Sequence, residues 1–225
     1  MLSRISPSTK TVGFWSAVFA TGFSLTYVIA QLAEWQGWLG SAGGPESAST
    51  PVGLVVLLTP SLLLGPSYLL AAVSIHELAS SDRKIWSHSA VVFATAYTVL
   101  ISINYYVQLA WVTPRLAAGR TAGIEPFLFT PFDSFLYAVD ILGYSLMSVS
   151  TLFAALVFPG DGVQKVARWF LISNGLLLPF IALQMYWHSL IWIAALWAVT
   201  FPGSMWSVAV IFRRAATSAT AGGDH

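Results

Sequence analysis

Six long apolar stretches follow one another along the chain, and they constrain the possible folds more than any other feature of the sequence. A helix that crosses about 30 Å of hydrocarbon needs about 20 predominantly apolar residues, and each stretch meets that length. Only 8% of the 225 residues are charged, far below the roughly 25% that is usual in soluble domains. We therefore predict an all-α fold, a polytopic integral membrane bundle of six helices that forms one transmembrane domain over residues 1–225. The predicted spans are approximately 11–35, 52–78, 86–113, 131–158, 164–187 and 189–213.

Basic residues gather on one side of this predicted bundle. Lys and Arg are retained on the cytoplasmic side of membrane proteins, so their distribution predicts the orientation of the chain. One side holds eight of them, namely Arg4, Lys10, Arg83, Lys84, Lys165, Arg168, Arg213 and Arg214. The other side holds Arg115 and Arg120. We expect both termini to be cytoplasmic, and we expect a multi-pass protein of the cell membrane that is surrounded by the lipid bilayer.

Polar side chains form stripes within four of the predicted spans. Residues spaced i, i+3, i+4 and i+7 share one face of a helix, and most hydrogen-bonding groups in spans one, three, four and five follow that spacing. Given the predicted directions of the spans, the stripes meet in the half of the bundle away from the cytoplasm. We therefore expect a polar cavity that opens to the non-cytoplasmic side. Its candidate ligand-binding residues are Gln31, Glu34, Asn104, Gln108, Asp133, Tyr137, Asp140, Tyr144, Gln184 and His188.

Asp140 is the most unusual of these residues, because it lies deep within a predicted span. A charged side chain at the centre of a membrane helix costs on the order of 2.5–3.5 kcal/mol, so Asp140 should face the bundle interior and either find partners or keep its proton. The predicted spans hold no Lys or Arg at that depth, which leaves His188 as the nearby candidate cation. Asp133 and Glu34 have simpler alternatives: Asp133 could cap a helix, and Glu34 could be an interfacial carboxylate. The amide side chains could equally form hydrogen bonds between helices.

The two long loops on the non-cytoplasmic side differ in composition. Residues 36–51 are rich in Gly, Ser and Pro, which is typical of a flexible connector. Residues 114–130 end in an apolar piece, which could lie along the membrane interface or fold over the mouth of the cavity. Pro60 and Pro66 in the second span predict a kinked or broken helix, and a broken helix can expose backbone carbonyls to a cavity.

Several kinds of site find no support in the sequence. The absence of cysteine excludes disulfides, thiolate zinc sites, iron–sulfur clusters and cysteine nucleophiles. The segment HELAS at residues 76–80 begins like a zinc-protease motif, but Ser80 stands where HExxH requires its second His. No basic patch interleaved with aromatic residues suggests nucleic-acid binding. We expect no metal, no cofactor and no nucleic-acid partner.

Three classes of function remain open. The first, which the sequence favours, is a binding protein or small transporter in which a small lipophilic or cationic ligand meets Asp140 as its counter-charge or as a coupled proton site. The second is a membrane-embedded enzyme that acts on a lipid or isoprenoid by carboxylate acid–base chemistry, with Asp140, Glu34 and His188 as candidate catalytic residues. The third is an accessory subunit of a larger membrane complex, whose protein partner the sequence does not identify. No acid–base pair has a diagnostic spacing, so whether the protein is an enzyme stays open.

Overall fold

The computed structural model describes residues 5–130, 132–158 and 160–220, and in these ranges all regular structure is helical. Six helical stretches are long and apolar enough to cross a membrane, so the prediction of an all-α fold with six such stretches is confirmed. Their bounds are Pro7–Trp35, Pro51–Leu78, Ser81–Ala117, Phe135–Ala155, Val163–Met185 and His188–Ala215.

Three of these spans are single helices and three are interrupted. The single helices are α1 (Pro7–Trp35), α2 (Pro51–Leu78) and α5 (Phe135–Ala155). The third span joins α3 (Lys84–Val107), a π-helical turn (Gln108–Val112) and α4 (Thr113–Ala117). The fifth contains α6 (Val163–Gly175) and α7 (Leu178–Ala182), and the sixth contains α8 (Ile191–Ala194) and α9 (Trp197–Thr220).

The start of α5 corrects one expectation about the fourth span. The helix begins at Phe135 and not at residue 131, because Ser134 is its N-cap: the Ser134 hydroxyl accepts a hydrogen bond from the Tyr137 amide at 3.1 Å. Such a cap satisfies one of the backbone donors that a helix leaves free at its start. Asp133 precedes the cap, so it is not the capping residue.

The prolines of the second span do not break it. The expectation was a kinked or broken helix, and α2 is not broken, because it continues from Pro51 to Leu78 through both Pro60 and Pro66. The neighbouring helix α3 contacts this region, where Thr98 Oγ1 donates to the Gly65 carbonyl at 3.0 Å. The interruptions lie instead in the third, fifth and sixth spans.

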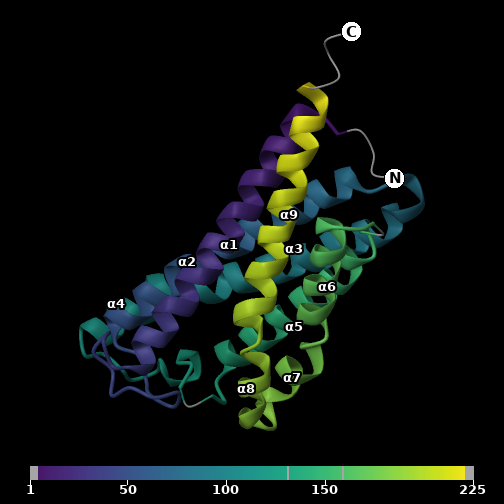
Figure 1. Cartoon of the computed structure of the whole chain (residues 1–225). Coiled ribbons are helices and arrows are strands. Elements are labelled where there is room, and N and C mark those ends of the chain that lie inside the picture. The colour runs from purple at the N-terminus through teal and green to yellow at the C-terminus, as the bar shows by residue number, and fades with distance from the viewer. Residues whose placement is uncertain (1–4, 131, 159, 221–225) are drawn as a thin grey trace.

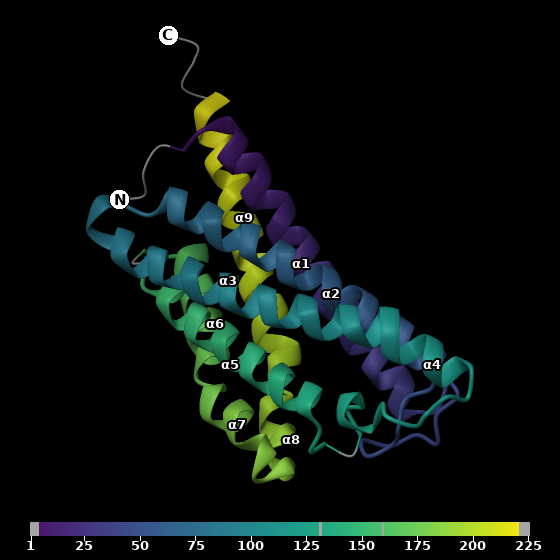
Figure 2. The same ribbon diagram turned by 180° about the vertical axis from the view of Figure 1, so that it is seen from behind.

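The helices pack so that the two ends of the bundle differ. Helix α1 packs against α2 and α9, α3 packs against α2 and α5, and α6 packs against α5 and α9. Helices α1 and α9 lie side by side near the two chain ends and diverge away from them (Figures 1 and 2). We call the end where α1 begins and α9 ends the terminal end. The opposite end, which carries the loop residues 36–50, 118–130 and 132–134, is the loop end.

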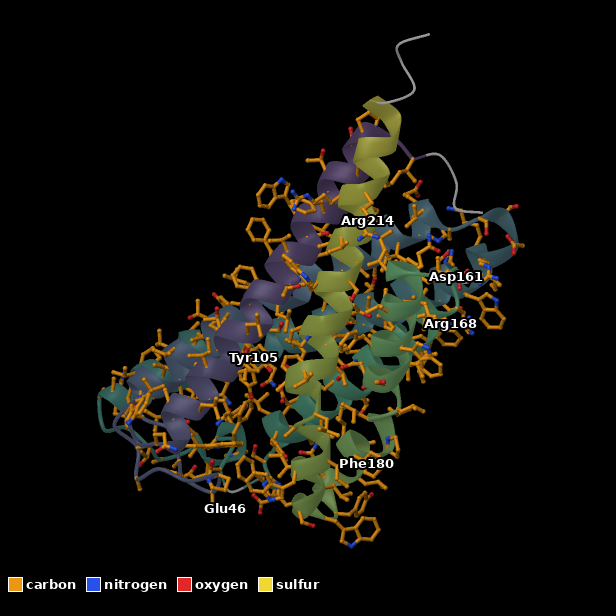
Figure 3. The ribbon with its side chains drawn as sticks, viewed as in Figure 1. Glu46, Tyr105, Asp161, Arg168, Phe180 and Arg214 are labelled. Carbon is orange, nitrogen blue, oxygen red and sulfur yellow. The ribbon has the colours of Figure 1, made fainter. Side chains whose placement is uncertain are left out.

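Basic residues cluster at the terminal end, where two of them cap helices. Arg83 Nη1 donates to the Leu156 carbonyl after α5 at 2.6 Å, and Lys84 Nζ donates to the His76 carbonyl of α2 at 2.5 Å. Cations at helix C-termini satisfy free carbonyls and complement the helix dipole. Figure 3 labels Arg168 and Arg214 towards this same end and Glu46 at the loop end.

Hydrogen bonds between helices hold the terminal half of the bundle together. The Tyr68 hydroxyl of α2 donates to Ser150 Oγ of α5 at 2.7 Å, and Ser150 in turn donates to the Ala90 carbonyl of α3 at 2.7 Å. On the other side, Asn174 of α6 accepts from Thr200 Oγ1 of α9 at 3.1 Å. These polar groups are therefore structural, and they lie apart from the loop-end half described next.

Candidate functional site

A cavity of about 480 Å³ lies in the loop-end half of the bundle. Residues from α1, α2, α3, α4, α5, α7, α8 and α9 line it, together with residues of both long loops. Its polar and aromatic lining residues are Tyr27, Gln31, Glu34, Trp35, Ser47, Ser49, Tyr105, Gln108, Phe129, Thr130, Phe132, Tyr137, Asp140, Tyr144, Gln184 and Trp197. Its volume falls within the range of about 300–1,000 Å³ that is usual for small-molecule sites.

Aromatic rings close the cavity towards the terminal end. Tyr144 and Trp197 line the cavity and contact one another edge to face, with ring centroids 5.5 Å apart. Behind them, Phe201 stacks on Trp197 at 5.3 Å and contacts Tyr68 at 5.4 Å, while Tyr97 contacts Tyr144 at 5.6 Å. Tyr68, Tyr97 and Phe201 are fully buried. This layer is the floor of the cavity, and it separates the cavity from the terminal half.

Asp140 lies on the cavity wall and is held by one neighbour outside it. Asn104 of α3, which is fully buried and does not line the cavity, donates from Nδ2 to Asp140 Oδ1 at 3.0 Å. The Asp140 side chain itself is half-buried. Nearby on the wall, the hydroxyl of Tyr105, which is buried and labelled in Figure 3, donates to the Tyr144 hydroxyl at 3.1 Å. Asn104 therefore positions Asp140, and the aromatic hydroxyls lie beside it.

Glu34 is the second acid on the cavity wall, and it is more deeply buried. Its exposed fraction is 2%, and neither carboxylate oxygen has a hydrogen-bond partner among the described residues. The carboxylate lies against Gly53 in the first turn of α2, where a Cβ atom would come within 2.7 Å of Glu34 Oε2. The positive end of a helix dipole stabilises a negative charge, which gives this position some compensation. A side chain at position 53 would therefore push the Glu34 carboxylate out of this place.

No Lys, Arg or His is present among the described residues that line the cavity. His188, the nearby cation expected from the sequence, lies outside the lining. Its ring stacks on Phe132 with centroids 4.2 Å apart, its Nδ1 lies 3.5 Å from the Tyr137 hydroxyl, and its Nε2 lies 3.7 Å from Glu46 Oε1. The last distance suits a weak ion pair when His188 is protonated and is too long for a hydrogen bond. The two wall acids, Asp140 and Glu34, therefore have no basic partner on the wall.

Both long loops cover the cavity at the loop end. Residues 44–45 and 47–49 of the first loop and 128–130 of the second line it, so the second loop folds over the cavity. Gln108 fastens this second loop, because its Nε2 donates to the Phe127 carbonyl at 2.5 Å. In the first loop, Gly43 adopts a positive φ of 80°, and a Cβ atom there would come within 3.0 Å of the Trp35 carbonyl oxygen. A side chain would be strained at that position.

The π-helical turn begins at the residue that fastens the cover. Gln108 opens the turn, and Thr113 Oγ1 donates back to the Gln108 carbonyl at 2.9 Å across it. Single π-helical turns inside α-helices occur frequently at functional sites. Here the turn separates α3 from α4 at the level where the third span meets the cavity.

The structure brings together seven of the ten candidate ligand-binding residues. The seven that line the cavity are Gln31, Glu34, Gln108, Tyr137, Asp140, Tyr144 and Gln184. Asn104 contacts Asp140 from outside, His188 contacts Tyr137 from outside, and Asp133 is exposed and does not line the cavity.

The candidate set left out several aromatic residues that line the cavity, among them Tyr27, Tyr105 and Trp197. Tyr27 lies one turn before Gln31 on the same face, and its hydroxyl donates to Gln31 Oε1 at 3.1 Å. Tyr105 stands three residues before Gln108, so the i, i+3 rule could have found it. Trp197 lies well inside a span and not at its end, where tryptophans favour the membrane interface. Its position inside the span, away from the interface, could have identified Trp197 as a cavity residue.

The fold is compatible with a multi-pass membrane protein, and it holds an acidic, aromatic cavity in one half of the helical bundle. Comparison of the chain with protein-family models, with curated proteins and with solved structures gives no match.

Proposed function

We propose that this protein binds a small organic cation with an apolar body in the loop-end cavity. One observation carries the proposal: two carboxylates, Asp140 and Glu34, lie on the cavity wall, and no basic side chain lies there among the described residues. A charged group buried in a bundle needs a partner, and an ammonium ligand would supply it. Tyr105, Tyr144 and Trp197 would add cation–π attraction, which is worth about 0.5–2 kcal/mol.

We place the protein in the cytoplasmic membrane, with both termini in the cytoplasm and the loop end on the opposite side. The bias of Lys and Arg towards the terminal end supports this orientation. The ligand would then bind in the non-cytoplasmic half, above the aromatic floor. If the protein also transports this ligand, the floor of Tyr68, Tyr97 and Phe201 is the layer that has to open.

Ligand charge can be tested at constant shape with three one-ring probes. Purified protein in lipid nanodiscs would be titrated with benzylammonium, benzyl alcohol and benzoate by calorimetry, with empty nanodiscs as the control for partition into lipid. We expect benzylammonium to bind about tenfold or more tightly than the alcohol, and benzoate to bind least. Equal affinity for the alcohol and the ammonium, or no binding of either, would contradict the proposal.

A further inference from the structure

Two aromatic pairs join α1 to the last span at different depths. Towards the floor, Tyr27 contacts Trp197 edge to face with ring centroids 6.0 Å apart. Towards the loop end, Trp35 contacts Trp192 of α8 at 5.7 Å. Tyr27 and Trp35 are eight positions apart, which corresponds to about 12 Å along a helix. The two pairs therefore frame a segment of the boundary between α1 and α8–α9, which we call the window.

The cavity reaches the surface of the bundle within this window. Leu32 of α1 lines the cavity and is 53% exposed, and Ala195, between α8 and α9, lines the cavity and is exposed as well. Gln31 and Ala198 are partly exposed lining residues on the two sides. The α8–α9 side carries small alanine side chains, so little covers the cavity there. In a membrane this surface faces the acyl chains, since α1 and the last span both have the length and hydropathy of membrane spans.

The other approach to the cavity is more covered. At the loop end the first loop contributes Pro45 and Ala48 to the lining, and the second contributes Leu128 and Phe129. The second loop is fastened by the Gln108 hydrogen bond described above. The window has no such cover: α1 packs extensively along α9, and towards α8 it makes the Trp35–Trp192 contact at the loop-end edge of the window.

We propose that the ligand is a single-chain amphiphile with an ammonium head, and that it enters from the loop-end leaflet through the window. This inference rests on the proposed function, because it assigns the head of the amphiphile to the wall near Asp140. The apolar chain then leaves the cavity between Leu32 and Ala195 and stays among the lipid acyl chains. Tyr27 and Gln31, which are joined by a hydrogen bond, line the path from the window to the cavity interior. A ligand of this class keeps its chain in hydrocarbon throughout, so the cavity needs to enclose only its head and first carbons.

Photocrosslinking in lipid nanodiscs tests the path of the chain. The probe is a long-chain primary alkylammonium with a diazirine near the middle of its chain, and mass spectrometry maps the adducts. We expect saturable adducts on α1 near Leu32 and on the α8–α9 junction near Ala195, displaced by benzylammonium because both heads share one site. Ala195→Trp should reduce this crosslinking about tenfold or more by filling the window.

Two further variants keep the test decisive. Leu32→Trp fills the window from the α1 side, and Val199→Trp places the same side chain on the exposed face of α9 outside the cavity lining. We expect the first to act like Ala195→Trp and the second to act like wild type. A thermal unfolding transition and a size-exclusion profile like those of wild type show that each variant is folded.

Two outcomes would overturn the window. Wild-type crosslinking in both window variants, or adducts confined to cavity walls away from the window, would refute it while leaving cation binding intact. A wild-type protein that binds no benzylammonium refutes the proposed function, and it also refutes entry of the ligand through the window, because that inference rests on the proposed function.

Discussion

Replacing Asp140 by Asn tests the charge at the centre of the proposed site. Asn104 Nδ2 donates to Asp140 Oδ1 at 3.0 Å, and an asparagine side chain at 140 keeps an oxygen that can accept this bond. The variant therefore preserves the shape of the wall and the contact between α3 and α5. What it loses is one negative charge facing the cavity, so we expect the fold to survive and the affinity for a cation to fall.

The size of the loss follows from the low polarity of the site. Two opposite unit charges about 4 Å apart attract by about 4 kcal/mol at an effective dielectric constant of 20. Removing water from the ammonium offsets part of this, which leaves about 2–3 kcal/mol. We therefore expect Asp140→Asn to weaken benzylammonium binding about 30- to 150-fold. Benzyl alcohol carries no charge, so its affinity should change little.

Calorimetry measures the affinities of benzylammonium and benzyl alcohol for wild type, Asp140→Asn and Asp133→Asn. Asp133 is an exposed carboxylate two turns away that does not line the cavity, so its variant should bind like wild type. An Asp140→Asn protein that binds benzylammonium as tightly as wild type would refute the reasoning. An equal loss for the ammonium and the alcohol would show that Asp140 shapes the cavity and does not supply its charge.

Four further outcomes follow from the same contacts. Affinity for benzylammonium should fall as the pH is lowered, because protonation removes the carboxylate charge that the cation needs; a titration series in nanodiscs measures this, and a pH-independent affinity would contradict it. Glu34→Met should raise the free energy of unfolding by about 1–3 kcal/mol, because it removes a buried carboxylate that has no hydrogen-bond partner among the described residues. Tyr68→Phe should cost about 0.5–1.5 kcal/mol by removing the 2.7 Å bond to Ser150, and an unchanged stability would show that the bond contributes nothing net. Gly175→Ala should lower the free energy of unfolding by about 1–3 kcal/mol, because the added Cβ would collide with α5. An unchanged free energy of unfolding for Gly175→Ala would mean that α6 moves aside. Denaturation of the purified Glu34→Met, Tyr68→Phe and Gly175→Ala variants measures all three free energies.

The fold was more predictable than the site. The six spans depend on the length and hydropathy of segments of the chain, and the start of α5 differed from expectation by only a few residues because a serine capped it. The interruptions of the third, fifth and sixth spans were not predicted. Pro60 and Pro66, from which a kinked or broken helix was expected, lie in a continuous helix. Helix α2 contacts a neighbouring helix beside Pro66, where Thr98 of α3 donates to the Gly65 carbonyl, and such contacts between helices cannot be read from one segment.

The polar stripes were predictable as faces of helices and not as the walls of a cavity. The i, i+3, i+4, i+7 rule correctly grouped Tyr137, Asp140 and Tyr144 on one side of α5. The same rule placed Asn104 with the site, whereas the structure puts it behind Asp140 and gives the wall position to Tyr105. One residue along a helix rotates a side chain by about 100°, so a small error in facing moves a residue from the cavity to its support.

The sequence by itself determined that this chain forms helices of membrane length, that basic residues mark one end, and that acids lie on inward-facing stripes. These are local properties, since hydropathy, helical periodicity and charge can be read along a single segment. The tertiary structure alone decided that Asp140 and Glu34 share one wall without a basic residue, and that His188 turns away to Phe132 and Glu46. It also decided that α1 follows α9 and leaves a window beside α8. The physical reason is that the angles at which helices cross depend on contacts between distant segments, and those contacts are absent from any single helix.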